Sequence, residues 1–251
     1  MFKLMKYEFR KQAFSKLVIL ALVGLLELVF FYGVITSNEN VIAMTMSLLA
    51  LFSMGALFFL AFESILTYSN DLKLKSSYML FLTPNTSYSI VGAKVLSAGI
   101  QIILAGIAFF AVFVIDGGIL IAKYDVLAQV KQLVIQFLDQ FFQLHIELSD
   151  IISVLTVIIV NWINTITLAF FSITLSTTFL ANKKFKGVVS FLIFIALNVI
   201  ISKITNLIIG DNGIAFNTIS VALFTASAIT LFFTVLTYIG TAWMLEKKVS
   251  V

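Results

Sequence analysis

The chain has 251 residues, of which 61% are hydrophobic and only 11% are charged, and its formal net charge is +4. This composition, with a mean hydropathy of +1.12, excludes a soluble protein and predicts an all-α integral membrane protein. The absence of cysteine and a single histidine, His145, argue against thiolate and histidine metal sites, and no cofactor is expected. The basic residues are scattered over the ends of apolar runs, which argues against nucleic-acid binding.

Residues 1–16 are predicted to form an amphipathic elbow helix at the membrane surface. One face carries apolar residues and another carries basic ones: Phe2, Met5, Phe9 and Ala13 against Lys3, Lys6 and Arg10. We expect the apolar face to lie among lipid headgroups and the basic face to meet anionic lipid. A signal peptide is the competing interpretation. We reject it because the next apolar run is of full span length and no small-residue cleavage site follows it.

Six apolar runs reach the length of about 20 residues that a helix needs to cross a bilayer. They are expected at residues 17–36, 41–67, 95–121, 151–180, 188–209 and 217–245. The whole chain, 1–251, is then a single transmembrane domain with both termini on the same side.

The distribution of Lys and Arg predicts the orientation of these spans. Thirteen of the 16 fall on the side of the termini, and only Lys123, Lys131 and Lys203 belong to the other side. Because positively charged loops stay in the cytoplasm, we expect both termini to be cytoplasmic and the protein to lie in the cell membrane.

The segment 68–94, between the second and third spans, is the longest basic interruption of the apolar sequence and contains the only proline, Pro84. Within it, residues 78–82 form an apolar patch that ends at Thr83 and Pro84, which predicts a short cytoplasmic helix. A loop that only joins two spans does not need such a patch, whereas a loop that docks in a partner's groove does. The alternative is that the patch lies flat on the bilayer.

Residues 122–150, with a core at 124–147, are predicted to form an external amphipathic helix. Apolar and polar residues recur at spacings of three and four on opposite faces of this segment. The helix either lies on the outer leaflet or closes the exit of a transport path, and its role stays open.

Polar residues inside the spans are candidates for a translocation path. Glu27 and Glu63 are expected to face protein or a watery cavity, because a central charge costs on the order of 3 kcal/mol in lipid. Neither has an evident Lys or Arg at matching depth, and a protonated or interfacial carboxyl is the alternative. Asn161 and Thr165 in the fourth span and Asn198 in the fifth are further candidates, although polar stripes also serve helix packing.

The loop after the second span resembles the first cytoplasmic loop of ABC-2 type exporter membrane subunits. The resemblance rests on Asp71, Lys73, Ser76, residues 80–82, Thr83, Pro84, Ser87, Gly92 and Lys94. Family members usually have Gly-Thr where this chain has Ser76 and Ser77. The predicted elbow and six spans extend the likeness over the whole chain.

The resemblance implies that the loop 71–84 carries a coupling helix, with Asp71, Lys73, Tyr78, Leu80, Phe81, Leu82 and Pro84 meeting a separate ATPase subunit. It also implies a second membrane subunit, as a homodimer. In its apolar richness, its many phenylalanines and its predicted external helix, the chain resembles subunits that export amphipathic or hydrophobic peptides, among them bacteriocin-immunity and phenol-soluble modulin exporters. Spans one, two and five of the paired chains would open the conduit. Tyr78 to Leu82 would receive the motion of the ATPase.

No Gly-x-x-x-x-Gly-Lys-[Ser/Thr] phosphate loop occurs in the chain, so ATP-driven work requires a partner chain, and the chain itself is not expected to be an enzyme. Two other hypotheses remain. One is a proton-coupled carrier that uses Glu27 and Glu63, and the other is a membrane scaffold or sensor that transports nothing.

Overall fold

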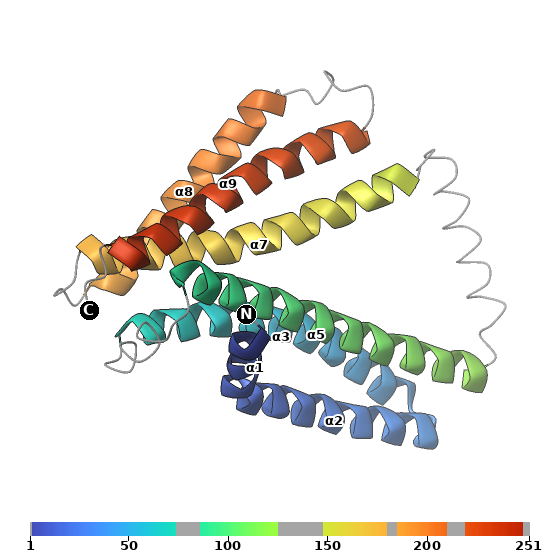
Figure 1. Cartoon of the computed structure of the whole chain (residues 1–251). Helices are drawn as coiled ribbons and strands as arrows, with labels where there is room; N and C mark the ends of the chain where they lie inside the picture. Colours follow the sequence, from blue (N-terminus) through green and yellow to red (C-terminus); the bar gives the residue numbers. More distant parts are fainter. Residues whose placement is uncertain (1, 74–85, 125–147, 180–184, 210–218, 248–251) are drawn as a thin grey trace. The chain divides into compact units, whose positions relative to one another are not determined.

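The computed structural model describes residues 2–73, 86–124, 148–179, 185–209 and 219–247, and it contains no strand among them (Figure 1). The helices are α1 (Phe2–Lys11), α2 (Ala13–Thr36), α3 (Glu39–Lys73), α5 (Ser87–Tyr124), α7 (Leu148–Phe179), α8 (Lys186–Ile209) and α9 (Ile219–Lys247).

Six of these helices, all but α1, are long and apolar enough to cross a membrane. The prediction of an all-α multi-pass membrane protein is therefore confirmed. Helices α2 and α8 end at the predicted residues, Thr36 and Ile209. Helices persist through these runs because lipid offers no partner to the backbone N–H and C=O groups, which must be satisfied within the segment.

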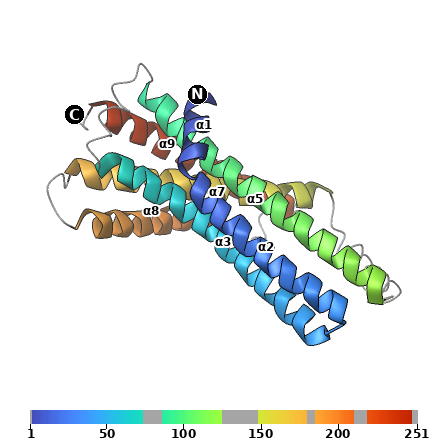
Figure 2. The ribbon, with the colours of Figure 1, turned by 90° about the horizontal axis from the view of Figure 1, so that it is seen from below.

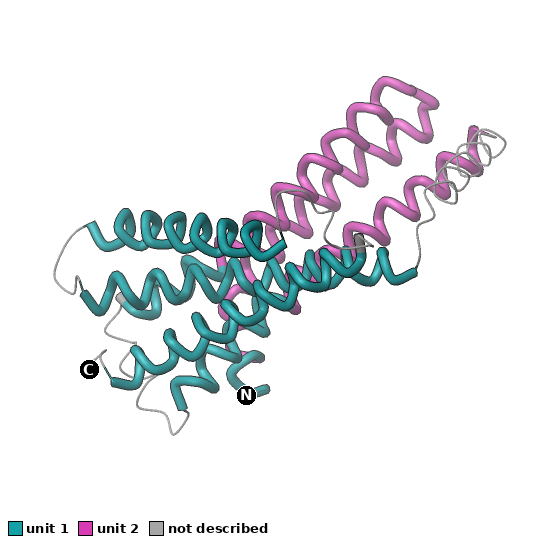
Figure 3. The backbone as a smooth tube through the Cα atoms, turned by 90° about the horizontal axis from the view of Figure 1, so that it is seen from above, with its two compact units in different colours: residues 1–5, 64–99, 146–251 teal, residues 6–63, 100–145 magenta. Residues whose placement is uncertain are grey.

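The chain divides into two compact units (Figure 3). Unit 1 comprises residues 1–5, 64–99 and 146–251, and unit 2 comprises residues 6–63 and 100–145. Unit 1 thus contains the last residues of α3, the first residues of α5, and α7, α8 and α9. Unit 2 contains α2 and the remainder of α3 and α5. The prediction of a single transmembrane domain stays a prediction.

In unit 1, α7 packs against both α8 and α9, and α8 contacts α9 (Figure 1). The α7–α9 contact is close at Gly240, where a Cβ atom would lie 2.8 Å from the Phe171 ring. Small residues at a helix interface allow backbones to approach each other in this way.

In unit 2, α2 and α3 form a tight hairpin (Figure 2). Ser37 adopts a left-handed conformation with φ 51°, and its N–H donates to Val34 O while the N–H of Asn38 donates to Gly33 O. The side chain of Asn38 accepts from the N–H of Val41 at 3.4 Å, so it caps the start of α3. The predicted four-residue break after the first span is therefore only two residues long.

The polar segment 68–94 was predicted as a loop, and this prediction is wrong at both ends. Helix α3 continues to Lys73 and α5 begins at Ser87, so Asp71 and Lys94 lie within helices. The start of α5 is capped by Thr86, whose Oγ1 accepts from the N–H of Ser89. A helix continues through polar residues wherever its backbone bonds are kept, so apolar run length underestimates its extent.

The elbow helix is shorter than predicted, because α1 ends at Lys11 and residues 13–16 already belong to α2. Whether α1 lies at a membrane surface stays a prediction. The predicted external helix lies outside the described residues over 125–147. Its predicted first residues, up to Tyr124, belong to α5, and its last, from Leu148, belong to α7.

Gly33 offers a test of the α2–α3 hairpin. A Cβ atom there would lie 3.0 Å from Val41 Cγ1 and 3.1 Å from Ile42 Cγ1. We expect Gly33→Ala to lower the free energy of unfolding by about 1–3 kcal/mol through overpacking. Thermal unfolding in detergent measures this change.

Gly24→Ala is the matched control, because a Cβ atom at Gly24 meets nothing within 4 Å. Alanine in a helix interior is favoured over glycine by about 1 kcal/mol, so this variant should be unchanged or more stable. Equal shifts in the two variants would contradict the close packing of the hairpin.

Candidate functional site

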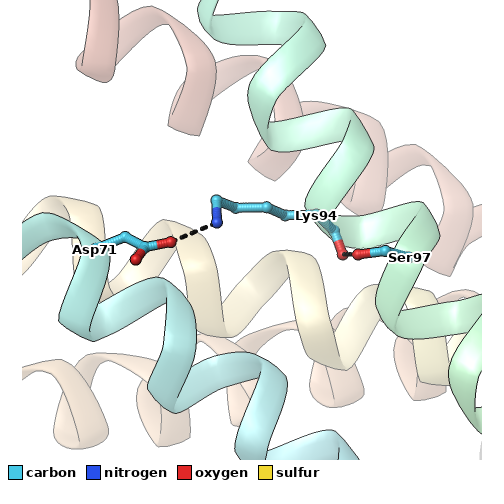
Figure 4. Close-up of polar contacts among 3 residues, drawn as sticks. All are labelled: Asp71, Lys94 and Ser97. Carbon is cyan, nitrogen blue, oxygen red and sulfur yellow. Dashed lines mark hydrogen bonds and ion pairs between the residues drawn. The ribbon is translucent and has the colours of Figure 1, made fainter. Parts of the chain in front are cut away.

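A buried ion pair joins α3 to α5 in unit 1. Lys94 Nζ lies 2.5 Å from Asp71 Oδ2, and the two side chains are 5% and 15% exposed (Figure 4). Ser97 donates from Oγ to the carbonyl of Lys94 at 3.0 Å. Breaking such a pair by removing one partner leaves an uncompensated charge with little access to water. The ion pair therefore holds the end of α3 and the start of α5 in a fixed register.

Tyr68 fastens the end of α3 to α7. It lies one turn before Asp71, is only 2% exposed, and its ring stacks on Phe170 with centroids 4.0 Å apart and an interplanar angle of 17°. Its hydroxyl forms a hydrogen bond of 2.5 Å with Thr174 Oγ1. A buried tyrosine with both its ring and its hydroxyl engaged has little freedom to move relative to α7.

Tyr88 fastens the start of α5 to α9. The hydroxyl of Tyr238 donates to the carbonyl of Tyr88 at 2.8 Å, and the two rings meet edge to face at 6.3 Å. Residues 91–95 of α5 are all buried, which places this part of the helix among its neighbours rather than at the surface of unit 1.

We call these residues the anchor cluster: Tyr68, Asp71, Tyr88, Lys94, Phe170, Thr174 and Tyr238. All seven belong to unit 1. They join the two helix ends on either side of residues 74–85 to each other, and they join one end to α7 and the other to α9. A displacement of either helix end is therefore resisted by contacts with two other helices.

Of the predicted coupling residues, Asp71 lies in the anchor cluster and Lys73 is the last residue of α3. Tyr78, Leu80, Phe81, Leu82 and Pro84 lie outside the described residues. Sequence reasoning grouped Asp71 and Lys94 in one loop but did not predict their pairing. It missed Tyr68 and Tyr238, for which burial between helices left no distinctive pattern in the sequence.

The structure places the path candidates of the fourth and fifth spans apart from the anchor cluster. Asn161 is exposed, Thr165 is partly buried and donates to the carbonyl of Asn161, and Asn198 is partly buried on α8. Their role in a translocation path stays a prediction. Asn164, between these two positions on α7, is buried, and its Oδ1 accepts from Thr234 Oγ1 of α9 at 3.2 Å.

Glu63 has partners in unit 2 that the sequence did not reveal. Ser15 of α2 donates to Glu63 Oε1, and Lys16 lies near enough to attract Glu63 electrostatically. Lys16 Nζ lies 4.8 Å from the centroid of the Phe9 ring. The prediction that Glu63 has no basic residue at matching depth is therefore wrong. The turn at Gln12 brings Lys16, near the start of α2, to the level of Glu63.

Glu27 has a different partner, Asp116 of α5, and their carboxyl groups are hydrogen bonded. Sequence reasoning gave Asp116 no role. The sequence held no signal for this pairing, because the predicted third span ends at residue 121, only five residues after Asp116, whereas the predicted first span ends nine residues after Glu27. Glu27 and Glu63 are not brought together. Ser15, the partner of Glu63, lies 12 residues from Glu27 along α2, a rise of about 18 Å.

Among the described residues, no three His, Cys, Asp or Glu side chains gather closely enough to hold a metal ion. Comparisons with protein-family models, curated protein sequences and solved structures found no match to this chain.

The ion pair can be tested by removing and exchanging its charges. We expect Asp71→Asn and Lys94→Met each to lower the free energy of unfolding by about 3–5 kcal/mol, because each removes the opposite charge that stabilises a charge with little access to water. The exchange Asp71→Lys with Lys94→Asp should recover part of this loss. Thermal unfolding of the purified protein in lipid nanodiscs measures the effect.

Glu246→Gln is the control for a carboxylate that is exposed, and it should change stability by less than about 0.5 kcal/mol. Two outcomes would show that the charges of Asp71 and Lys94 do not interact in the folded protein. In one, the exchanged variant is no more stable than the two single variants; in the other, the single variants are as stable as this control.

Proposed function

We propose that this chain is the membrane-spanning subunit of an ATP-driven exporter of the ABC-2 type. In this proposal a separate ATPase subunit docks on the segment 71–84, which begins in the last turn of α3, and two copies of the chain form a homodimer in the cell membrane. The observation that supports it best is the anchor cluster, because it fixes both helix ends that lead into this loop.

The anchor cluster is suited to pass on a mechanical displacement. A force on residues 74–85 acts on the ends of α3 and α5, which the Asp71–Lys94 pair obliges to move together. Tyr68 then passes the displacement of α3 to α7, and the hydrogen bond from Tyr238 couples α5 to α9. Packed side chains transmit such displacements well, because they resist compression. A loop that only connected two spans would have no use for these contacts.

The direction of work and the substrate are inferred from the resemblance. In its apolar richness this chain resembles subunits that export amphipathic or hydrophobic peptides, and we assign this class of substrate. Spans one, two and five of the two chains would open the conduit. The anchor cluster adds α7 and α9, the fourth and sixth spans, as the elements that receive the motion first.

The docking step predicts the behaviour of a loop variant. Leu80→Asp with Phe81→Asp would place two unpaired carboxylates in the cleft of the ATPase, where desolvation disfavours them. We expect a normally inserted protein that no longer copurifies with an ATPase and no longer exports. Phe185→Asp, at a 73% exposed residue on the same predicted side, is the matched control and should retain both properties.

The anchor cluster predicts a separate defect in the same assay. Tyr68→Phe keeps the stacked ring and removes the hydrogen bond to Thr174, so it should retain the ATPase and weaken the coupling of ATP turnover to export.

Full export by the doubly substituted loop variant would contradict the proposal. Transport in proteoliposomes under a proton gradient without any ATPase would favour the proton-coupled carrier instead. If no candidate substrate changed the ATP turnover of the partner ATPase, the result would favour a membrane scaffold or sensor that transports nothing.

The proposed orientation has its own test, since the chain has no cysteine and single cysteines can be introduced cleanly. Cysteines at Asn70 and Lys184 should be protected from an impermeant thiol reagent in intact cells, and cysteines at Gln140 and Asn212 should react. Reaction at residue 184 in intact cells would reverse the assigned orientation.

A further inference from the structure

Two carboxyl groups meet inside unit 2, far from either end of their helices. Glu27 of α2 and Asp116 of α5 are hydrogen bonded to each other. Asp116 is only 1% exposed, and its Oδ2 atom and the Oε1 atom of Glu27 are buried and, apart from the contact between the two carboxyl groups, have no hydrogen-bond partner among the described residues. With a rise of about 1.5 Å per residue, Glu27 lies about 13 Å from the end of α2, close to the middle of a bilayer core about 30 Å thick.

An apolar cluster lies directly beyond the pair on the same helices. One turn after Glu27, Phe30 is fully buried, and it packs with Val34 and Ile42. Ile119 and Leu120, which follow Asp116 by one turn, pack against this cluster. The cluster therefore separates the pair from the far ends of α2 and α5.

The charged groups of the surrounding helices do not neutralise the pair. Within the described part of unit 2, the spans carry Lys16, Glu39, Glu63 and Lys123, together with Tyr32 and Tyr124. Neither carboxyl of the pair is acted on by any of these groups, and each is influenced by the other. Lys16 acts on Glu63 instead.

Two ionised carboxylates have no proton to donate to each other, and at hydrogen-bonding distance they repel strongly away from water. A hydrogen bond between them requires one proton, which one carboxyl donates and the other accepts. We propose that Glu27 and Asp116 form a proton-binding site that holds one shared proton at neutral pH, and that this proton joins α2 to α5. This site does not depend on the ATPase or on the anchor cluster.

A monovalent metal ion is the alternative occupant of the space between the two carboxyl groups. The hydrogen bond favours the proton, because a metal ion between the groups would break it. Infrared spectroscopy separates the two occupants, since only a protonated carboxyl shows the carbonyl stretching band of a carboxylic acid.

The test uses the full chain in lipid nanodiscs at neutral pH. We expect the wild-type protein to show a protonated carboxyl band that shifts in heavy water, and we expect Glu27→Gln and Asp116→Asn each to lose one such group per chain. Glu63→Gln is the matched control and should keep the band. A wild-type protein without the band, or a band that both variants keep, would overturn the proposal, as would a band that sodium chloride removes and choline chloride leaves.

Thermal unfolding against pH provides a second measurement. Raising the pH removes the shared proton and leaves two repelling carboxylates, so the unfolding midpoint of the wild-type protein should fall as the solution becomes alkaline. The amide of Glu27→Gln donates a hydrogen bond to Asp116 at every pH, so this variant should show a smaller fall. Equal pH dependence in the two proteins would overturn the proposal. Neither measurement involves an ATPase, so its failure is distinct from a failure of the proposed function.

Discussion

Unit 1 depends on the ion pair between Asp71 and Lys94, two residues 23 positions apart in the chain, which joins the end of α3 to the start of α5. Because both side chains have little access to water, each charge is strongly stabilised by the other. The pair thereby sets the register between α3 and α5. Tyr68 can then stack on Phe170 and Tyr88 can accept from Tyr238, since both tyrosines lie within two turns of the paired charges on their own helices.

The remaining polar side chains of the spans follow a different rule. The buried hydroxyl groups of α7 and α9 mostly donate to a carbonyl three or four residues earlier in their own helix, as Ser172 and Thr241 do. Such bonds satisfy the hydroxyl without any partner on another helix, so a stripe of Ser and Thr allows close packing but specifies little. In unit 1, specific polar contacts between helices come instead from side chains such as Tyr68, Asn164, Lys94 and Tyr238.

The number of spans and the ends of α2 and α8 were predictable from the sequence, because the residues of a helix that lipid surrounds are apolar. The ends of α3 and α5 were not, since a helix extends beyond the bilayer wherever its backbone stays hydrogen bonded, and polar composition then resembles a loop. The pairing of Lys94 with Asp71 and of Glu27 with Asp116 depends on which helix faces meet. Which faces meet is decided by the packing of α2, α3 and α5, and the pattern of apolar and polar residues in the sequence does not predict it.

The pairs Asp71–Lys94 and Glu27–Asp116 both place ionisable side chains where water has little access, and they avoid an uncompensated charge in opposite ways. Asp71 and Lys94 bring opposite charges together, so the pair is neutral and requires nothing from outside the protein. Glu27 and Asp116 bring two acids together, so their contact requires a proton taken from the solution. The first contact is therefore constant over the pH range in which Asp and Lys stay ionised, whereas the second responds to pH. The contact between α3 and α5 in unit 1 is therefore independent of pH over this range. The contact between α2 and α5 in unit 2 weakens as the pH rises.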